Sequence, residues 1–323
     1  MNNKIETKYF DKIVDDFGIW HNSDGAEPIR DNGYNTADSA EALIVYLLFE
    51  NNEKSNVLFS FINKSLIVDS FLGVADKNRN FLPDIADSLS LGKIMWASGF
   101  SYSKKFHIDD SVQLINKSTT ALNKNNDIYG LAFGLLGAVY VNKELSNFYF
   151  KKIKSFFTNT TEDWMWFEPT VKGNSGIIPY SLLRYGMIFN NDDSIKLGQN
   201  ILKFLEKCCT YERHRGPIGN NGWFSNSTKI APNFAQSPVD ASYMSWAWLV
   251  AYQISNDSFD KERHDAWMQW FEGSNILRVK MYDPFDMHCF DSIEEWGVAY
   301  TSSAQSNASF ILSKLMSLNN ISI

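Results

Sequence analysis

Apolar residues recur every three to four positions along most of this 323-residue chain. Segments such as AEALIVYLLFE (40–50) and LGQNILKFLEKC (197–208) have the period of an amphipathic helix, whereas the strict alternation typical of strands is scarce. The pattern predicts about twelve helices, over residues 7–16, 37–50, 53–73, 87–99, 108–123, 128–141, 144–157, 175–190, 193–208, 237–255, 259–272 and 302–317.

Local start signals agree with these helices. Asp127 precedes IYGLAFGLL, Ser237 and Pro238 supply a cap and a first-turn proline, and Asp192 or Asp193 can cap the helix that follows. Successive helices without an obvious linker predict antiparallel hairpins that close into a ring. We therefore expect an all-α fold, an (α/α)6 toroid, with a single domain over residues 1–323. Its longer loops, at 17–36, 74–86, 158–174, 209–236 and 273–301, would surround a central pocket.

Those loops and the helix starts beside them combine aromatic, amide, acidic and glycine residues, as in TEDWMWFEPT (161–170). Sugars need this mixture, because their C–H faces pack on aromatic rings while their hydroxyls need polar partners. Cleavage of a glycosidic bond commonly uses two carboxyl groups. The catalytic candidates are Asp163, Glu168 and Asp240. The substrate-binding candidates are His21, Tyr34, Asp38, Trp164, Trp166, Asn174, Trp223, Gln236, Asp291 and Gln305.

Each candidate also has a structural interpretation. Taken alone, Trp164 and Trp166 are more typical of a core than of a stacking surface. Asp240 falls in the first turn of a helix, where an acid is favourable without any catalytic task. His21 could be a satisfied structural histidine. The hypothesis of a site gains weight because five loops share the same composition.

Composition and charge exclude several functions. The net charge is −7 with no basic stripe, which argues against nucleic-acid binding. The longest apolar run, LAFGLLGAVYV (131–141), is too short to span a membrane, and the first residues do not resemble a signal peptide. Three cysteines form no disulfide framework, so we expect a cytoplasmic protein. Nucleotide-binding and metalloprotease motifs are absent and the His288–Cys289 pair lacks zinc-ligand spacing, so we expect neither cofactor nor metal.

The motifs of these loops resemble those of a bacterial group of (α/α)6-toroid proteins in the six-hairpin glycosidase superfamily, found alone or attached to glycosyltransferases. That group reads D-x-G-I-x-Q-H, G-Y-x-T-D-D-N-A-R-A-L, W-x-W-F-E, N-A-x-x-P-x-A-L-L and Q-x-P-V-[DE]-A, then D-G-L and N-x-G-A-E-S. This chain has, in the same order, DFGIWHN, GYNTADSAEAL, DWMWFE, NSGIIPYSLL, NFAQSPVDAS, CFDSI and SSAQSN. The matching positions are His21, Asp38, Asp163, Trp164, Trp166, Glu168, Asn174, Gln236, Asp240 and Asp291.

The departures from that group concern charge. Ala37 stands where an aspartate is usual, Glu41 replaces an arginine, and Gln305 replaces a glutamate. Ser88 and Leu89 stand where an acidic pair is usual. Three functions therefore remain open: a glycoside hydrolase-like enzyme, a non-catalytic glycan-binding barrel that assists a glycosyltransferase, and a sugar epimerase or isomerase. The last generally needs histidines, and His21, His214 and His288 fall in the loops.

Overall fold

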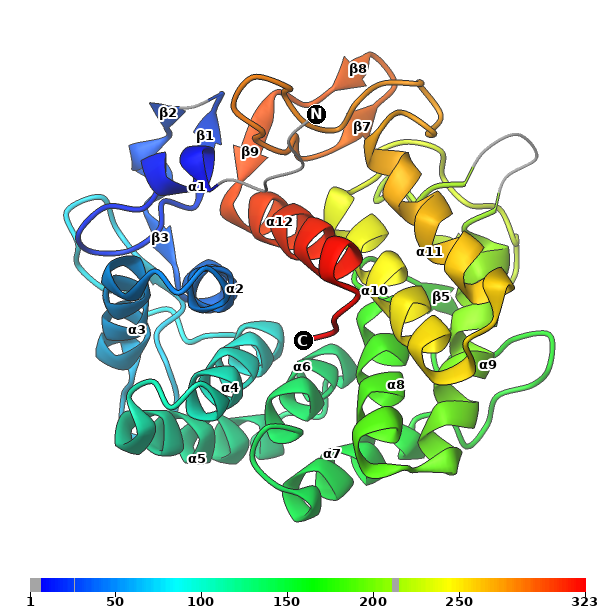
Figure 1. Ribbon diagram of the computed structural model, residues 1–323, viewed down its shortest axis with the longest axis horizontal. Helices are drawn as coiled ribbons and strands as arrows, with labels where there is room; N and C mark the ends of the chain where they lie inside the picture. Colours follow the sequence, from blue (N-terminus) through cyan, green and yellow to red (C-terminus); the bar gives the residue numbers. More distant parts are fainter. Residues whose placement is uncertain (1–6, 26, 211–214) are drawn as a thin grey trace.

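The computed structural model describes residues 7–25, 27–210 and 215–323. This part of the chain folds into twelve α-helices joined by loops with short strands (Figure 1). The helices are α1 Lys8–Lys12, α2 Thr36–Leu48, α3 Asn52–Ser65, α4 Ser88–Ser103, α5 Ile108–Lys124, α6 Ile128–Ala138, α7 Lys143–Ser155, α8 Ile177–Phe189, α9 Asp192–Cys208, α10 Pro238–Ser255, α11 Ser258–Phe271 and α12 Ala304–Asn319.

The even-numbered helices form a closed inner ring, since each packs against the next and α12 returns to α2 (Figure 1). Helices α3, α5, α7, α9 and α11 each pack outside the preceding inner helix. The predicted (α/α)6 toroid is therefore confirmed. Two predicted helices are too long: the helix expected over 7–16 ends at Lys12, and the helix expected over 53–73 ends at Ser65. Leu66 has an extended backbone and pairs with Phe71, so the apolar run SLIVDSFLG forms a turn instead of further helix.

The inner helices are buried on nearly all sides, whereas the outer helices are buried on one face. In α6 every residue except Tyr129 is buried, because neighbours surround the helix. In the outer helix α9 the buried positions recur at helical spacing and the lysines face outward. The apolar period that predicted the helices thus also separates the two layers.

Glycines bring α4 and α6 into close contact. A Cβ at Gly99 would lie 2.2 Å from the backbone oxygen of Gly137, and one at Gly137 would lie 2.3 Å from that of Met95. Gly92 and Gly130 meet in the same way one heptad earlier. These two helices can approach so closely only because side chains are missing at the contact.

The starts of the inner helices gather at one end of the ring, which we call the mouth, because each hairpin returns the chain to the same side. Polar side-chain caps mark five of these six starts, and α8 begins after Gly176 without one. Asn35, Asp87 and Asp127 accept backbone N–H groups of α2, α4 and α6 at 2.8 Å, and Ser237 and Ser303 cap α10 and α12. The mouth is therefore lined with polar groups before any ligand is considered.

Short antiparallel strands fasten the long loops to one another. Strand β1 (Asn22–Asp24) pairs with β2 (Glu27–Pro28) and with β9 (Thr301–Ser303), which joins the first loop to the last. Strand β3 (Tyr34–Asn35) pairs with β4 (Val74–Ala75), β5 (Thr170–Val171) with β6 (Phe224–Ser225), and β7 (Ile293–Glu294) with β8 (Gly297–Val298). None of the described helices is long and apolar enough to cross a membrane.

Candidate functional site

Four polar side chains from four inner helices meet inside the ring, and we call them the floor network: Glu41, Lys93, Tyr243 and Gln305. The Lys93 ammonium lies 3.0 Å from Glu41 Oε2, and the Tyr243 hydroxyl donates to Glu41 Oε1 at 3.2 Å. Gln305 hydrogen-bonds to Tyr243. Burial raises the pKa of Glu41 although Lys93 opposes the rise. The floor network therefore places a buried ion pair beneath the mouth.

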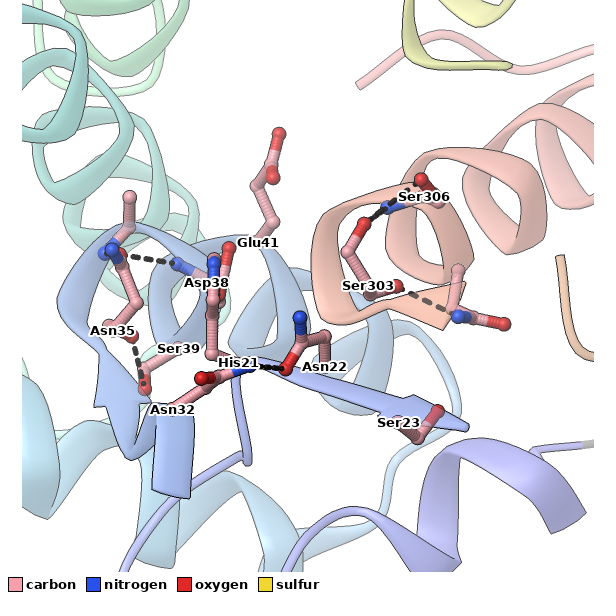
Figure 2. Close-up of polar contacts among 12 residues, drawn as sticks. His21, Asn22, Ser23, Asn32, Asn35, Asp38, Ser39, Glu41, Ser303 and Ser306 are labelled. Carbon is pink, nitrogen blue, oxygen red and sulfur yellow. Dashed lines mark hydrogen bonds and ion pairs between the residues drawn. The ribbon is translucent and has the colours of Figure 1, made fainter. Parts of the chain in front are cut away.

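A histidine and two aspartates lie where α2 and α12 begin, and Figure 2 shows His21 and Asp38 of this group beside Ser303 and Ser306. His21 Nδ1 is 2.7 Å from Asp38 Oδ2, and the histidine side chain is 43% exposed while that of Asp38 is buried. Asp291 accepts hydrogen bonds of 2.7 Å from the Ser303 backbone N–H and from the Ser306 hydroxyl. The hydrogen bond to Asp38 raises the pKa of His21, and the charge of Asp291 adds to the rise. This side of the mouth thus holds an exposed imidazole beside fixed carboxylates.

A pocket of about 450 Å³ opens where α4, α6 and α8 begin. It is lined by Asp87, Ser88, Leu89, Asp127, Tyr129, Lys172, Gly173, Asn174 and Trp223. Within the described chain the Tyr129 hydroxyl is buried without a hydrogen-bond partner. Burial raises the pKa of that hydroxyl, and the charges of Glu168, Asp127 and Asp240 add to the rise. The pocket therefore offers a neutral hydroxyl, carboxylates and an indole ring to one ligand.

Asp240 forms part of the wall behind this pocket. It is 8% exposed, and the backbone N–H of Asn174 donates to its Oδ1. A Cβ on Gly173 would lie 3.4 Å from Asp240 Oδ2 and 3.5 Å from the Trp223 ring, so acid and indole meet around this glycine. Burial raises the pKa of Asp240 to about 7, against the lowering effect of the Asn174 N–H. Asp240 can consequently exist as a neutral acid near neutral pH.

Glu168 lies near the edge of the same pocket. Its side chain is 39% exposed and its Oε2 is 3.3 Å from the Lys172 ammonium. The charge of Glu168 adds to the rise that burial causes in the pKa of Tyr129, so this carboxylate lies within electrostatic range of the pocket.

Other residues expected in the site lie elsewhere. Asp163 and Trp164 line a separate hollow beside α9. The Trp164 indole N–H donates to the Glu168 backbone oxygen at 2.8 Å, and Trp166 is only 2% exposed. Trp166 packs in the core, as its structural interpretation proposed, whereas Trp164 is 9% exposed and keeps part of its ring at the hollow.

Tyr34 and Gln236 are also buried and turned away from the pocket. Tyr34 stacks on Trp20 and donates to Asp15 at 2.7 Å. Gln236 accepts the Trp270 indole N–H at 3.2 Å and packs against Gly216. The mouth thus brings together His21, Asp38, Glu168, Asn174, Trp223, Asp240, Asp291 and Gln305, and it leaves out Asp163, Trp164, Trp166, Tyr34 and Gln236.

Sequence reasoning did not single out Tyr129 or Lys93 as site residues. Lys93 carried a signal, because a lysine inside the apolar stretch LGKIMWA needs a buried partner. Glu41 carried the same signal within AEALIVYLL. Tyr129 carried no such signal in the sequence, since its neighbours in the chain are those of an ordinary core helix.

The histidines are dispersed over the molecule. His21 lies at the mouth, whereas His288 packs between Tyr9 and Phe290 and bonds to Asp286. His264 belongs to α11 and is buried against the Ser245 backbone oxygen of α10, and His107 precedes the first residue of the outer helix α5. His214 lies outside the described residues. Among the described residues no group of three or more His, Cys, Asp and Glu side chains is arranged to hold a metal ion.

The sequence matches no protein-family model and no curated protein. Its fold is similar to that of several solved structures. A D-mannose isomerase is 9% identical with a TM-score of 0.75, over 98% of this chain and 95% of that chain. Cellobiose 2-epimerase from Bacillus thermoamylovorans B4167 is 9% identical with a TM-score of 0.75, over 96% and 95%. An alpha-amylase from Clostridium perfringens is 14% identical with a TM-score of 0.63, over 97% and 98%. At these identities the similarity establishes the toroid fold alone.

Proposed function

We propose that this protein is a carbohydrate-active enzyme that cleaves a glycosidic bond, with Asp240 as the proton donor. The observation that carries the proposal is the pKa of Asp240, which burial raises to about 7 beside a pocket that also holds Trp223. A general acid works best when its pKa lies near the working pH. Solved structures of sugar-processing enzymes with the same fold support the substrate class.

The proposed reaction uses two carboxyl groups in different states. Asp240 gives its proton to the glycosidic oxygen as the bond between that oxygen and the anomeric carbon breaks. A water molecule adds to the anomeric carbon, and Glu168 takes the proton that the water loses. Glu168 suits this role because its side chain is partly exposed, so that water can reach it, and its Oε2 lies 3.3 Å from the Lys172 ammonium. Asp163 takes no part, since it lines a different hollow.

The rest of the pocket would hold the sugar. The Trp223 ring offers a face for the C–H side of a pyranose. The Tyr129 hydroxyl, the Asp87 and Asp127 carboxylates and Asn174 offer hydrogen-bond partners for its hydroxyls.

The test is a panel of oligosaccharides assayed with the wild type and three variants. Asp240→Asn and Glu168→Gln should each lower kcat at least about 100-fold. Asp163→Asn removes a carboxylate from the loop that also carries Glu168, and this variant should retain activity because Asp163 lines a different hollow. Wild-type kcat should fall as the pH rises above about 7, because Asp240 then loses the proton that it donates. Full activity of both Asp240→Asn and Glu168→Gln on a cleaved substrate would refute the assignment.

A sugar epimerase or isomerase is the second candidate, and the His21–Asp38 pair favours it. The pair leaves an exposed imidazole with a raised pKa at the mouth, suited to moving a proton at a sugar carbon. Incubation of free sugars and disaccharides in D2O separates the candidates. Deuterium at a sugar carbon, abolished by His21→Gln, supports this reaction, whereas hydrolysis without exchange supports the first. Glycan binding without either reaction would favour a binding barrel.

A further inference from the structure

A hollow of about 660 Å³ lies outside the mouth, on the outer side of the ring between α9 and the 158–174 loop. We call it the outer hollow. It is lined by Thr160, Thr161, Glu162, Asp163, Trp164, Met165, Asn200, Lys203, Phe204, Lys207, Cys208, Phe224 and Lys229. The segment TEDWMWFEPT, prominent in the sequence, therefore contributes most of its acids and one tryptophan to this place and not to the mouth.

The two-stranded sheet β5–β6 separates the outer hollow from the mouth. Trp223 lines the mouth pocket, while the next residue, Phe224, lines the outer hollow. On the partner segment Asp163 and Trp164 face the outer hollow, whereas Lys172 and Asn174 face the mouth. Val171 pairs with Phe224 between them. The two cavities are thus neighbours with no shared lining residue.

Three lysines line the outer hollow together with two acidic residues. Lys203 and Lys207 lie one turn apart on α9, and Lys229 comes from the loop after β6. In the described chain none of them forms an ion pair, although Glu162 and Asp163 line the same hollow. Burial raises the pKa of the Cys208 thiol, and the charges of Lys207 and Lys229 oppose the rise, so both ammonium groups lie within electrostatic range of Cys208, which lines the same hollow.

An aromatic wall stands beside these lysines. The rings of Trp164 and Phe224 are stacked with centroids 5.8 Å apart and an interplanar angle of 10°, and Phe204 meets Trp164 edge-on at 5.2 Å. The Glu162 and Asp163 carboxylates line the same hollow and can accept hydrogen bonds from ligand hydroxyls.

We propose that the outer hollow binds a saccharide that carries an anionic group, a carboxylate or a phosphate. The lysine ammonium groups bind the anion, and the aromatic side chains pack against the sugar ring. The carboxylates accept hydrogen bonds from the hydroxyls of the sugar. A fully anionic ligand fits less well, because Glu162 and Asp163 would repel its second charge. This site is independent of the cleavage chemistry proposed at the mouth.

Isothermal titration of the full chain with D-glucuronate, D-glucose 6-phosphate, D-glucose and inorganic phosphate tests the proposal. At low salt we expect one or both anionic sugars to bind at least about tenfold more tightly than glucose and phosphate, and added salt to weaken them. The double variant Lys203→Gln/Lys207→Gln should lose at least about tenfold in affinity. Lys196→Gln, on the same helix but away from the hollow, is the matched control and should bind as the wild type does.

The direction in which a second variant changes the binding affinity distinguishes the outer hollow from the mouth. Asp163→Asn should strengthen binding of the anionic sugars, since it removes a negative charge near the anion, while Asp240→Asn should leave it unchanged. Binding of neither anionic sugar, unchanged binding in the lysine variant, or phosphate binding as tight as that of glucose 6-phosphate would overturn the proposal. Loss of hydrolysis in Asp240→Asn bears on the mouth alone.

Discussion

At the scale of single residues, burial decides the chemistry of Asp240. The residue lies in the first turn of α10, where the helix dipole favours a negative charge. The Asn174 N–H also favours the carboxylate. Burial outweighs both and raises the pKa to about 7, because the surrounding side chains exclude the water that would stabilise the charge. A group that the sequence presents as a helix-start acid can thereby hold a proton near neutral pH.

This shift predicts a dependence of stability on pH. The pKa of Asp240 is higher in the folded than in the unfolded chain, so the protonated carboxyl stabilises the folded state. This stabilisation is fully present below about pH 4 and is lost as the pH rises through about 7. Asp240→Asn cannot ionise. Relative to the wild type, its free energy of unfolding should therefore increase by about 2 kcal/mol between pH 5 and pH 8. Urea unfolding of both proteins at the two pH values measures this difference, and a pH-independent difference would show that Asp240 titrates normally.

At the scale of elements, the contact between α4 and α6 depends on glycine. Gly92 and Gly99 of α4 face Gly130 and the Gly137 region of α6, and the obstructing atoms are largely backbone atoms, which cannot rotate away. The same contact positions Ser88 and Asp127, at the starts of the two helices, beside the pocket. Close packing of these helices therefore sets the width of the mouth on this side.

Gly99→Ala tests the role of this contact. Alanine is favoured over glycine in an isolated helix by about 1 kcal/mol. In this chain its Cβ would lie 2.2 Å from the Gly137 oxygen, so we expect destabilisation by about 1–3 kcal/mol. Gln113→Ala, at an exposed position of α5, is the control and should leave the unfolding midpoint nearly unchanged. Thermal and urea unfolding give both values, and a stabilised Gly99→Ala would disprove the close approach.

At the scale of the whole molecule, the floor network joins helices that are far apart in the sequence. Glu41 of α2 contacts Lys93 of α4 and Tyr243 of α10, which begins almost on the other side of the ring. Carboxylates on both sides of the mouth affect the pKa values in this network. The charge of Asp38 adds to the rise that burial causes in the pKa of Glu41, and the charge of Asp240 does the same for Tyr243. The ring is therefore joined by polar contacts across its interior as well as by the packing of neighbouring helices.

A double-mutant cycle measures this connection. Glu41→Gln or Lys93→Met alone leaves one partner buried without its counter-charge and should cost about 3–5 kcal/mol of folding free energy. The double variant Glu41→Gln/Lys93→Met removes both charges and should cost clearly less than the sum. Additive losses in urea unfolding would mean that the two side chains act independently.

The toroid was predictable because its determinants are local. The period of apolar residues and the caps at Asp127 and Ser237 specify where helices begin, and twelve helices without a linker leave few architectures besides a ring of hairpins. The end of α3 was not predictable in the same way. The run SLIVDSFLG continues the apolar period, and only the pairing of Leu66 with Phe71 turns it away from the helix.

By itself, then, the sequence determined the helices, the ring and the loops that surround its mouth, since these follow from neighbouring residues. Tertiary structure alone decided which polar residues share a cavity. Asp163 and Glu168 are five positions apart, yet they face different cavities, and Gln236 is buried although Asp240 lies beside the mouth pocket. Exposure and pKa depend on groups brought close by folding, such as the Asn174 N–H at Asp240, and no local pattern encodes those distances.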